Sequence, residues 1–258
     1  MLKTRLIAVL ILHDGRVVQS VRFRHTNAIH YDPIHAMECF NKWAVDEIVM
    51  LNVSRNPDSR DAFAEAVAAI SSSCFVPLAA GGWITDEAFA ATLLKSGADK
   101  LILNTALADA PALVTTLSRR YGAQCIVASM DVKRSDSGAD AVVVNRATRQ
   151  VSNDPAAWAN RAETLGAGEI FFNSVDHDGA RKGYNLDCLK QICSAVRIPV
   201  IAFGGVFTWQ HLVEGVNAGA AAVAAANIFH YTEHSTKKAK RHLAQAGIPV
   251  RNEGRARA

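Results

Sequence analysis

The strongest constraint on the fold of this chain is an alternation of short apolar segments with longer amphipathic segments, which recurs along its whole length. The apolar segments are rich in β-branched residues, as is typical of strands that are buried on both faces. They span residues 6–12, 47–53, 76–79, 100–103, 125–131, 169–173, 200–202 and 221–225. The segments with apolar residues at helical spacing span 33–42, 60–72, 86–96, 111–120, 155–165, 186–195 and 209–217. Eight such strands predict an α/β protein with a (β/α)8 barrel (TIM barrel), because a doubly wound sheet would contain five or six.

The chain also repeats itself at about half its length. An offset of 122 residues relates Pro77 to Pro199, Gly82 to Gly204 and Gly97 to Gly219. Offsets of 120 and 121 residues relate Ile11 to Asp131 and Asn52 to Asn173. Because four strands repeated twice close one barrel, the repeat predicts a single domain over residues 1–258 that consists of two half-barrels. We expect its basic tail, residues 252–258, to be disordered.

Composition and charge exclude several classes of protein. The chain is 50% hydrophobic and 20% charged, which suits a globular core and excludes a disordered or coiled-coil protein. Its net charge of +4 is too small for a nucleic-acid-binding surface, and we expect the basic residues near the C-terminus to lie on a solvated helix face and a frayed end. These are Lys237, Lys238, Lys240, Arg241, Arg251, Arg255 and Arg257. No apolar run is long enough to cross a membrane, so we expect neither a nucleic acid nor a membrane as partner.

The cysteines and histidines predict neither disulfides nor a metal site. Five cysteines without C-x-x-C spacing indicate reduced thiols and a cytoplasmic location. The nine histidines do not show the paired spacing with carboxylates that is typical of metal ligands. We therefore expect no metal and no cofactor.

Glycine pairs at predicted strand ends indicate where a ligand binds. In a barrel of this kind the active site lies at the C-terminal ends of the strands, where glycine lets backbone N–H groups approach an anion and Asn or Thr adds side-chain donors. Each half of the chain has such a set, namely Gly81, Gly82, Asn104 and Thr105, and then Gly204, Gly205, Ala226 and Asn227. We therefore expect two phosphate sites on opposite rims and a small molecule phosphorylated at both ends. The alternative is that these glycines only make tight strand-to-helix turns.

Motifs along the whole chain resemble one known family. They are Asp14-Gly15-Arg16-Val17-Val18, Gly97-Ala98-Asp99-Lys100, Asn104-Thr105-Ala106, Gly166-Ala167-Gly168-Glu169-Ile170, Asp176-His177-Asp178-Gly179 and Ile228-Phe229-His230. With these motifs the chain resembles the cyclase subunit of imidazole glycerol phosphate synthase. The resemblance implies a barrel that receives ammonia from a glutaminase subunit at its bottom and passes it to a bisphosphorylated ribonucleotide at its top. It also implies that Asn173, Asp178 and Gly179 contact the substrate.

The chain departs from this family at the top of the barrel. Of the two catalytic aspartates of the family, the second is present as Asp131 and the first falls on Ile11. Cyclisation needs both a general acid and a general base, and isoleucine can be neither. Further family residues are replaced by Gln19 (a loop lysine), Asn52 (an aspartate), Trp83 (a phosphate-loop glycine), Phe203 and Asn227 (serines). We expect Trp83 to fill space that a phosphate would need, and cyclase activity to be altered or reduced.

At the other end of the barrel the family pattern is complete. The family closes its ammonia entrance with a ring of charges, and these positions are Arg5, Glu47, Lys100 and Glu169 here. Asp99 matches the family's contact to the glutaminase. The alternative reading is a cluster of salt bridges at the barrel end. Retention of all four charges while the top has changed indicates that ammonia transfer persists.

Three functions are consistent with this pattern. The first is a synthase subunit that forms a heterodimer with a glutaminase and feeds ammonia to a changed acceptor. Ile11 resembles the branch of the family that serves acetamidino-sugar and surface polysaccharide synthesis, in which a separate amidating enzyme uses the ammonia. The second is a working cyclase (a lyase) of histidine biosynthesis. The third is a non-catalytic scaffold that activates the glutaminase.

Overall fold

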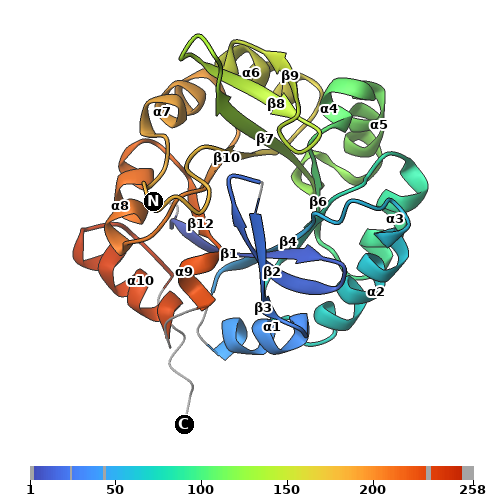
Figure 1. Ribbon diagram of the computed structural model, residues 1–258, viewed down its shortest axis with the longest axis horizontal. Coiled ribbons are helices and arrows are strands. Elements are labelled where there is room, and N and C mark those ends of the chain that lie inside the picture. The colour runs from blue at the N-terminus through green and yellow to red at the C-terminus, as the bar shows by residue number, and fades with distance from the viewer. Residues whose placement is uncertain (1–2, 24, 43–44, 231–233, 252–258) are drawn as a thin grey trace.

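Eight parallel strands close into a barrel at the centre of the molecule (Figure 1). The computed structural model describes residues 3–23, 25–42, 45–230 and 234–251. In order round the barrel, the strands are β1 (Arg5–His13), β4 (Glu47–Asn52), β5 (Leu78–Gly81), β6 (Lys100–Leu103), β7 (Ile126–Arg134), β10 (Glu169–Ser174), β11 (Val200–Phe203) and β12 (Ala222–Ala225). Parallel pairing of β12 with β1 closes the ring. All eight fall on the predicted segments, so the predicted (β/α)8 barrel is confirmed.

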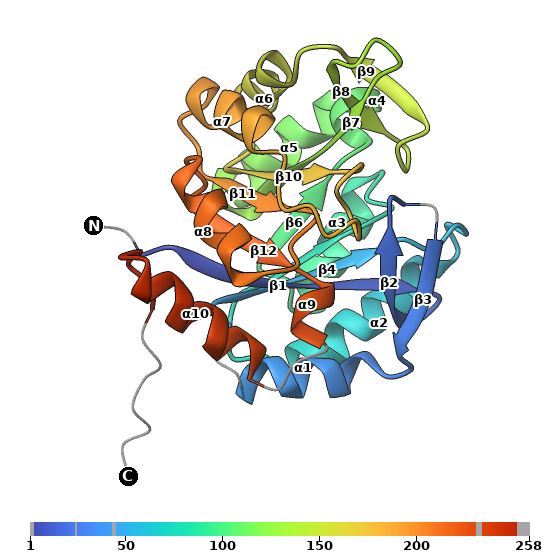
Figure 2. The same ribbon diagram turned by 60° about the vertical axis from the view of Figure 1, so that its left-hand side comes forward.

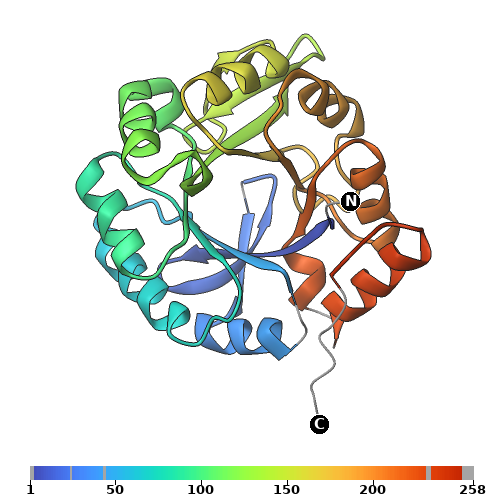
Figure 3. The same ribbon diagram turned by 180° about the vertical axis from the view of Figure 1, so that it is seen from behind.

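Helices surround the barrel on all sides, as the view from behind also shows (Figure 3). The seven predicted helices are α1 (Pro33–Lys42), α2 (Ser59–Ser71), α3 (Glu87–Lys95), α5 (Pro111–Tyr121), α6 (Pro155–Thr164), α7 (Leu186–Ala195) and α8 (Trp209–Asn217). Local chemistry explains several starts: the Asp86 carboxylate accepts the Phe89 N–H, and Asp154 caps α6. Four further helical segments are α4 (Ala106–Asp109), η1 (Ala123–Cys125), α9 (Asn227–His230) and α10 (Ser235–Gln245).

Two antiparallel hairpins that the sequence did not predict extend the barrel at its C-terminal end. Hairpin β2 (Arg16–Val21) and β3 (His25–His30) follows β1, and hairpin β8 (Asp140–Val144) and β9 (Arg149–Ser152) follows β7. Figure 2 shows β2 and β3 standing at the end of the barrel away from the N-terminus. Because β1 and β7 begin the two half-barrels, the hairpins occupy equivalent places and belong to the internal repeat.

Equivalent backbone hydrogen bonds support the half-barrel repeat. The Ile48 N–H donates to the Pro77 carbonyl, and the Ile170 N–H donates to the Pro199 carbonyl, both at 2.9 Å. The register corrects one predicted correspondence, because Ile11 pairs with Leu51 whereas Asp131 pairs with Asn173. Leu51, and not Asn52, is therefore the equivalent of Asn173. A slip of one residue exchanges the faces of a strand, and Asn52 accordingly turns to the helix layer and donates to the Ser59 hydroxyl at 3.0 Å.

Alternation along the strands separates two cores. One lies between strands and helices, and the other fills the barrel with side chains such as Ile7, Val9, Ile11, Val49 and Phe171. Phe171 and Phe203 pack ring against ring in this interior, with centroids 5.1 Å apart. Apart from Ser129, which shares the inward face of β7 with Val127, the barrel interior is therefore mostly apolar between the charged residues at its bottom and the polar residues at its mouth.

The C-terminal helix α10 corrects the prediction of a wholly solvated basic face. Lys238 and Arg241 are exposed, but Lys240 is buried and its ammonium lies 2.6 Å from Asp46 Oδ1. The other Asp46 oxygen accepts the N–H of Leu6 in β1 at 2.8 Å. This pair fixes α10 to the start of β1 and β4. The predicted disorder of residues 252–258 falls outside the described residues.

Helices long and apolar enough to traverse a lipid bilayer do not occur in the described part of the chain.

Candidate functional site

The mouth of the barrel contains a buried carboxyl group at the end of β7. Asp131 is 8% exposed and accepts hydrogen bonds from the side-chain amides of Asn104, at 3.1 Å, and Asn173, at 3.2 Å. Burial raises the pKa of Asp131 to about 7, the nearby Asp178 adds to this rise, and the two amides oppose it. A carboxyl group that titrates near neutral pH can donate or accept a proton in a reaction.

Ile11 occupies the equivalent position in the other half-barrel. β1 and β7 lie four strands apart in either direction round the ring, so Ile11 and Asp131 stand on opposite walls. Ile11 is 6% exposed and packs into the apolar interior of the barrel. The wall opposite Asp131 therefore offers methyl groups where an acid–base pair would need a second carboxylate.

Asp178 and Gly179, in the loop after β10, hold the β2–β3 hairpin against the barrel mouth. The Ser20 hydroxyl donates to Asp178 Oδ2 at 2.6 Å, and the Arg22 N–H donates to the Asp178 carbonyl at 3.0 Å. Burial raises the pKa of Asp178, while Ser20 and the backbone of the hairpin partly offset this. Gly179 has a φ of +64°, and a Cβ there would meet Val21. Both residues thus have a role in loop packing beside the ligand role that the resemblance implies.

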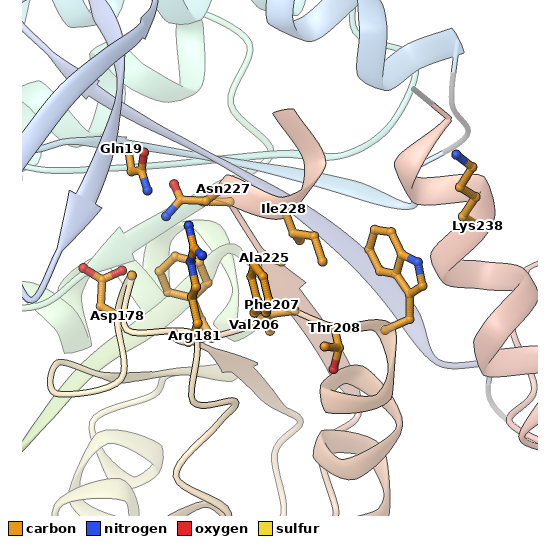
Figure 4. Close-up of a pocket in the computed structure, with 16 residues that line it drawn as sticks. Gln19, Asp178, Arg181, Val206, Phe207, Thr208, Ala225, Asn227, Ile228 and Lys238 are labelled. Carbon is orange, nitrogen blue, oxygen red and sulfur yellow. The ribbon is translucent and has the colours of Figure 1, made fainter. Parts of the chain in front are cut away.

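A cavity of about 590 Å³ opens beside this hairpin, at the ends of β11 and β12 (Figure 4). Its lining includes the predicted phosphate residues Gly204, Gly205, Ala226 and Asn227, together with Asp178 and Gly179. It also includes Gln19 and Lys238, which the sequence analysis named in other contexts, and Arg181, Phe207 and Trp209, which the sequence did not single out. The Arg181 guanidinium lies over the Phe207 ring, 4.6 Å from its centroid. The second half of the barrel thus combines the predicted glycines with two cations.

Packing also requires glycine at the two positions that follow β11. Gly204 and Gly205 have φ values of +94° and +96°, and a Cβ on Gly205 would collide with the Gly183 carbonyl. The side-chain oxygens of Asn173 and Asn227 are buried without a hydrogen-bond partner among the described residues. Asn227 is among the residues that line the cavity.

The first half of the mouth is arranged differently. The Trp83 indole N–H donates to the Ser54 carbonyl at 2.9 Å, which ties the loops after β4 and β5 together. Asn104 donates to the Ser129 carbonyl as well as to Asp131, and the Thr105 hydroxyl accepts the Asn145 N–H at 3.2 Å. Gly81 and Gly82 pack tightly against β6 and the end of β4. The predicted phosphate residues of this half are therefore engaged within the protein.

The four predicted gate residues meet at the bottom of the barrel. Arg5 contacts Glu47 at 2.6 Å and Glu169 at 3.1 Å, and Lys100 contacts the same two carboxylates at 2.9 and 3.1 Å. Burial alone would lower the pKa of Arg5, but Glu169 and Glu47 outweigh it and raise the pKa. The charges alternate in a closed ring. Exposed Asp99 lies beside the ring, and its Oδ2 accepts the Leu78 N–H at 2.8 Å.

The described residues contain no group of three or more His, Cys, Asp or Glu side chains that could hold a metal ion. Arg181 and Lys238 are the site residues that sequence reasoning missed. The signal for Arg181 was a basic residue two positions after the motif that ends at Gly179, whereas Lys238 reaches the cavity only through the packing of α10.

Replacing Asp131 with asparagine is expected to stabilise the protein at pH 8 and to change little below pH 4. The folded-state pKa of about 7 exceeds the unfolded value of about 3.9, so the folded protein binds this proton more tightly and loses stability as pH rises from 4 through 7. The gap of about three pH units sets an upper limit of about 4 kcal/mol. Urea unfolding at pH 5 and pH 8 measures the effect, with Asp136→Asn, at an exposed turn, as the control. Equal pH dependence in wild type and Asp131→Asn would contradict the prediction.

Comparison with known families gives a match that covers most of these residues. A family model described as "Histidine biosynthesis protein" matches residues 5–235, which include every strand of the barrel.

Proposed function

The chain belongs to the histidine biosynthesis protein family of barrel enzymes, and from this premise we propose that it is the barrel subunit of a glutamine amidotransferase complex. In this proposal a glutaminase subunit docks where the strands begin, and its ammonia passes along the barrel to an acceptor at the mouth. The proposed acceptor belongs to an amidino-sugar pathway. A separate enzyme uses the delivered ammonia to amidate it.

The charged ring at the bottom is the observation that carries this proposal. Glu47 is almost fully buried, with its side chain 2% exposed, yet it is paired with both Arg5 and Lys100. Burying Glu47 and partly burying the other three charges has a desolvation cost that apolar residues at the same positions would avoid. A ring of paired charges at one end of an apolar barrel interior suits a gate that holds back ions and admits a small neutral molecule. Asp99, exposed beside the ring, offers a charged contact to a docked partner.

The residues at the barrel mouth support the proposal that the ammonia acceptor differs from that of a cyclase. Ammonia needs no general base to become a nucleophile, but ring closure with cleavage of a second bond needs an acid and a base on opposite sides of the substrate. Asp131 can supply only one of these, and Ile11 occupies the other wall. Delivery of ammonia to another enzyme would not require the missing group.

A working cyclase of histidine biosynthesis is the second candidate. It is favoured by the retained Asp131, whose pKa of about 7 suits proton transfer at neutral pH, and by the cavity beside Gly204 and Gly205. A scaffold that only activates the glutaminase would need neither feature.

The proposal predicts a salt-sensitive heterodimer with a glutaminase subunit from the same genome. We expect co-purification, an interface of roughly 1,200–2,000 Å² and faster glutamine hydrolysis in the complex. Asp99→Lys reverses a charge on the docking face and should slow association by about tenfold. Lys100→Ala opens the ring and should impair ammonia transfer more than docking.

The matched control is Asp187→Lys, the same charge reversal on the first turn of α7, at the opposite end of the barrel. It should leave association unchanged. If the two proteins do not bind, or if Asp99→Lys and Asp187→Lys behave alike, the ring is only a salt-bridge cluster and the proposal fails.

A further inference from the structure

We infer that Phe75 is the apolar anchor by which this barrel holds its partner, and that the glutaminase subunit presents an apolar pocket for Phe75 with a basic group at its edge that faces Asp99. The inference rests on the proposed function in naming a glutaminase as the occupant, and it adds an apolar contact to a docking face so far described only by its charges. It comes from an exposed aromatic side chain that the fold itself does not require.

Phe75 is the most exposed large hydrophobic side chain in the described part of the chain, at 87%. It lies in the loop between the end of α2 and the start of β5, and its neighbours Cys74 and Val76 turn inward and pack against the core. The Cys74 thiol donates to the Val76 carbonyl at 3.1 Å. Phe75 could turn inward only if its two neighbours turned out, so the path of the backbone holds its ring in solvent.

The equivalent loop of the second half-barrel has a charged residue at this position. The offset of 122 residues that relates Pro77 to Pro199 also relates Phe75 to Arg197. Arg197 is exposed as well, and its loop leads into β11 as the loop of Phe75 leads into β5. Because a barrel strand can begin after either residue, the reason for an aromatic side chain at Phe75 lies outside the fold.

Phe75 stands on the face that carries the charged ring. Its loop leads into β5, which pairs with β4 and β6, the strands that begin at Glu47 and Lys100. The Asp99 N–H donates to the Leu78 carbonyl at 2.7 Å, and the Asp99 carboxylate accepts the Leu78 N–H at 2.8 Å. An exposed aromatic ring and an exposed carboxylate therefore lie on neighbouring loops where the strands begin.

These features fit a different protein better than a second copy of this chain. In a symmetric dimer through Phe75 the two copies of Asp99 would lie close together, and like charges across a contact are unfavourable. A partner with an apolar pocket and a basic edge would satisfy both residues. Aromatic side chains are frequent anchors of protein interfaces when polar residues surround them, and Ser72 and Ser73 are exposed polar neighbours in the same loop.

The test is calorimetric titration of the intact barrel and its variants with the glutaminase subunit from the same genome. We expect Phe75→Ala to weaken association about thirtyfold, which corresponds to about 2 kcal/mol at an interface anchor. Phe75→Leu keeps an apolar side chain and should weaken association by no more than about fivefold. The loss for Phe75→Ala should be the same at about 0.05 M and about 0.5 M salt, whereas the loss for Asp99→Lys should shrink at the higher salt.

Tyr31→Ala is the matched control, because Tyr31 is an aromatic residue that is 76% exposed in the loop between β3 and α1, at the C-terminal end of the barrel. It should change the affinity by no more than about twofold. Thermal unfolding of Phe75→Ala should match that of the wild type, since an exposed side chain contributes little to stability. A loss of binding in this variant is then separate from any loss of folding.

The inference is overturned if Phe75→Ala binds within about threefold of the wild type, if its loss disappears at high salt, or if Tyr31→Ala weakens association equally. It is also overturned if the isolated wild type sediments as a dimer that Phe75→Ala converts to a monomer, because a second copy is then the occupant. Unchanged binding by Phe75→Ala leaves the proposed complex intact, whereas a wild type that does not bind the glutaminase refutes both.

Discussion

Replacing Lys240 with methionine is expected to lower the free energy of unfolding by roughly 3–5 kcal/mol, the usual effect of leaving a buried charge without its partner. The Lys240 and Asp46 side chains are 8% and 3% exposed, and their charged atoms lie 2.6 Å apart. Methionine keeps the length of the side chain and removes the ammonium, so that, among the described residues, Asp46 keeps the N–H of Leu6 as its hydrogen-bond donor. Chemical denaturation at pH 7 measures the loss.

Arg241→Met is the control, because Arg241 is exposed on the same helix. It should change stability by no more than about 0.5 kcal/mol. The double variant Lys240→Met with Asp46→Asn should recover part of the loss, because no unpaired charge remains buried. If Lys240→Met and Arg241→Met have equal effects, the pair does not anchor α10 as described.

The isolated barrel with ammonium salts is expected to turn over the bisphosphorylated ribonucleotide of imidazole glycerol phosphate synthase at least about a hundredfold more slowly than an ordinary cyclase. Loss of a general acid or base removes on the order of 10²–10⁴ in rate, and Ile11 stands where the second carboxylate is needed. The engaged Asn104 and Thr105 should raise KM in addition. Steady-state kinetics on the purified chain measures kcat/KM directly.

Ile11→Asp alone should restore little of this activity, because Gln19 and Trp83 remain and the new carboxylate would enter an apolar barrel wall. Ile11→Val is the control for packing at this position. A wild-type kcat/KM within about tenfold of ordinary enzyme values, which lie at about 10⁴–10⁸ M⁻¹s⁻¹, would contradict the prediction. That result would favour the histidine-biosynthesis cyclase instead.

Much of the fold could be predicted because each barrel strand has a local signal. Segment 100–103, for example, is apolar and follows the turn at Gly97, and the structure places β6 at the same residues. Strands β2, β3 and β9 were missed because they mix polar and apolar residues, and β8 was missed although residues 141–144 form an apolar run. The turn between β8 and β9 has little local sequence signal, since Asn145, Arg146 and Ala147 all adopt positive φ without a glycine.

The candidate site was predictable in part. The repeat located Asp131, Ile11 and the glycine pairs, because a fixed offset in a barrel implies a fixed angle round its axis. It did not distinguish the two halves, which have similar glycine pairs in the sequence. The difference arises from contacts of Thr105 with Asn145 and of Arg181 with Phe207, which depend on how the loops pack.

The sequence by itself determined the number of barrel strands, their order along the chain and the opposed places of Ile11 and Asp131, since these follow from alternation and spacing along the chain. Only the tertiary structure decided which polar side chains meet outside the charged ring that the resemblance implied. Ser20 and Asp178 are 158 residues apart in the sequence, and Asp46 and Lys240 are 194 apart. No local pattern selects such partners, because they become neighbours only when β12 pairs with β1 and the loops and α10 pack on the closed barrel.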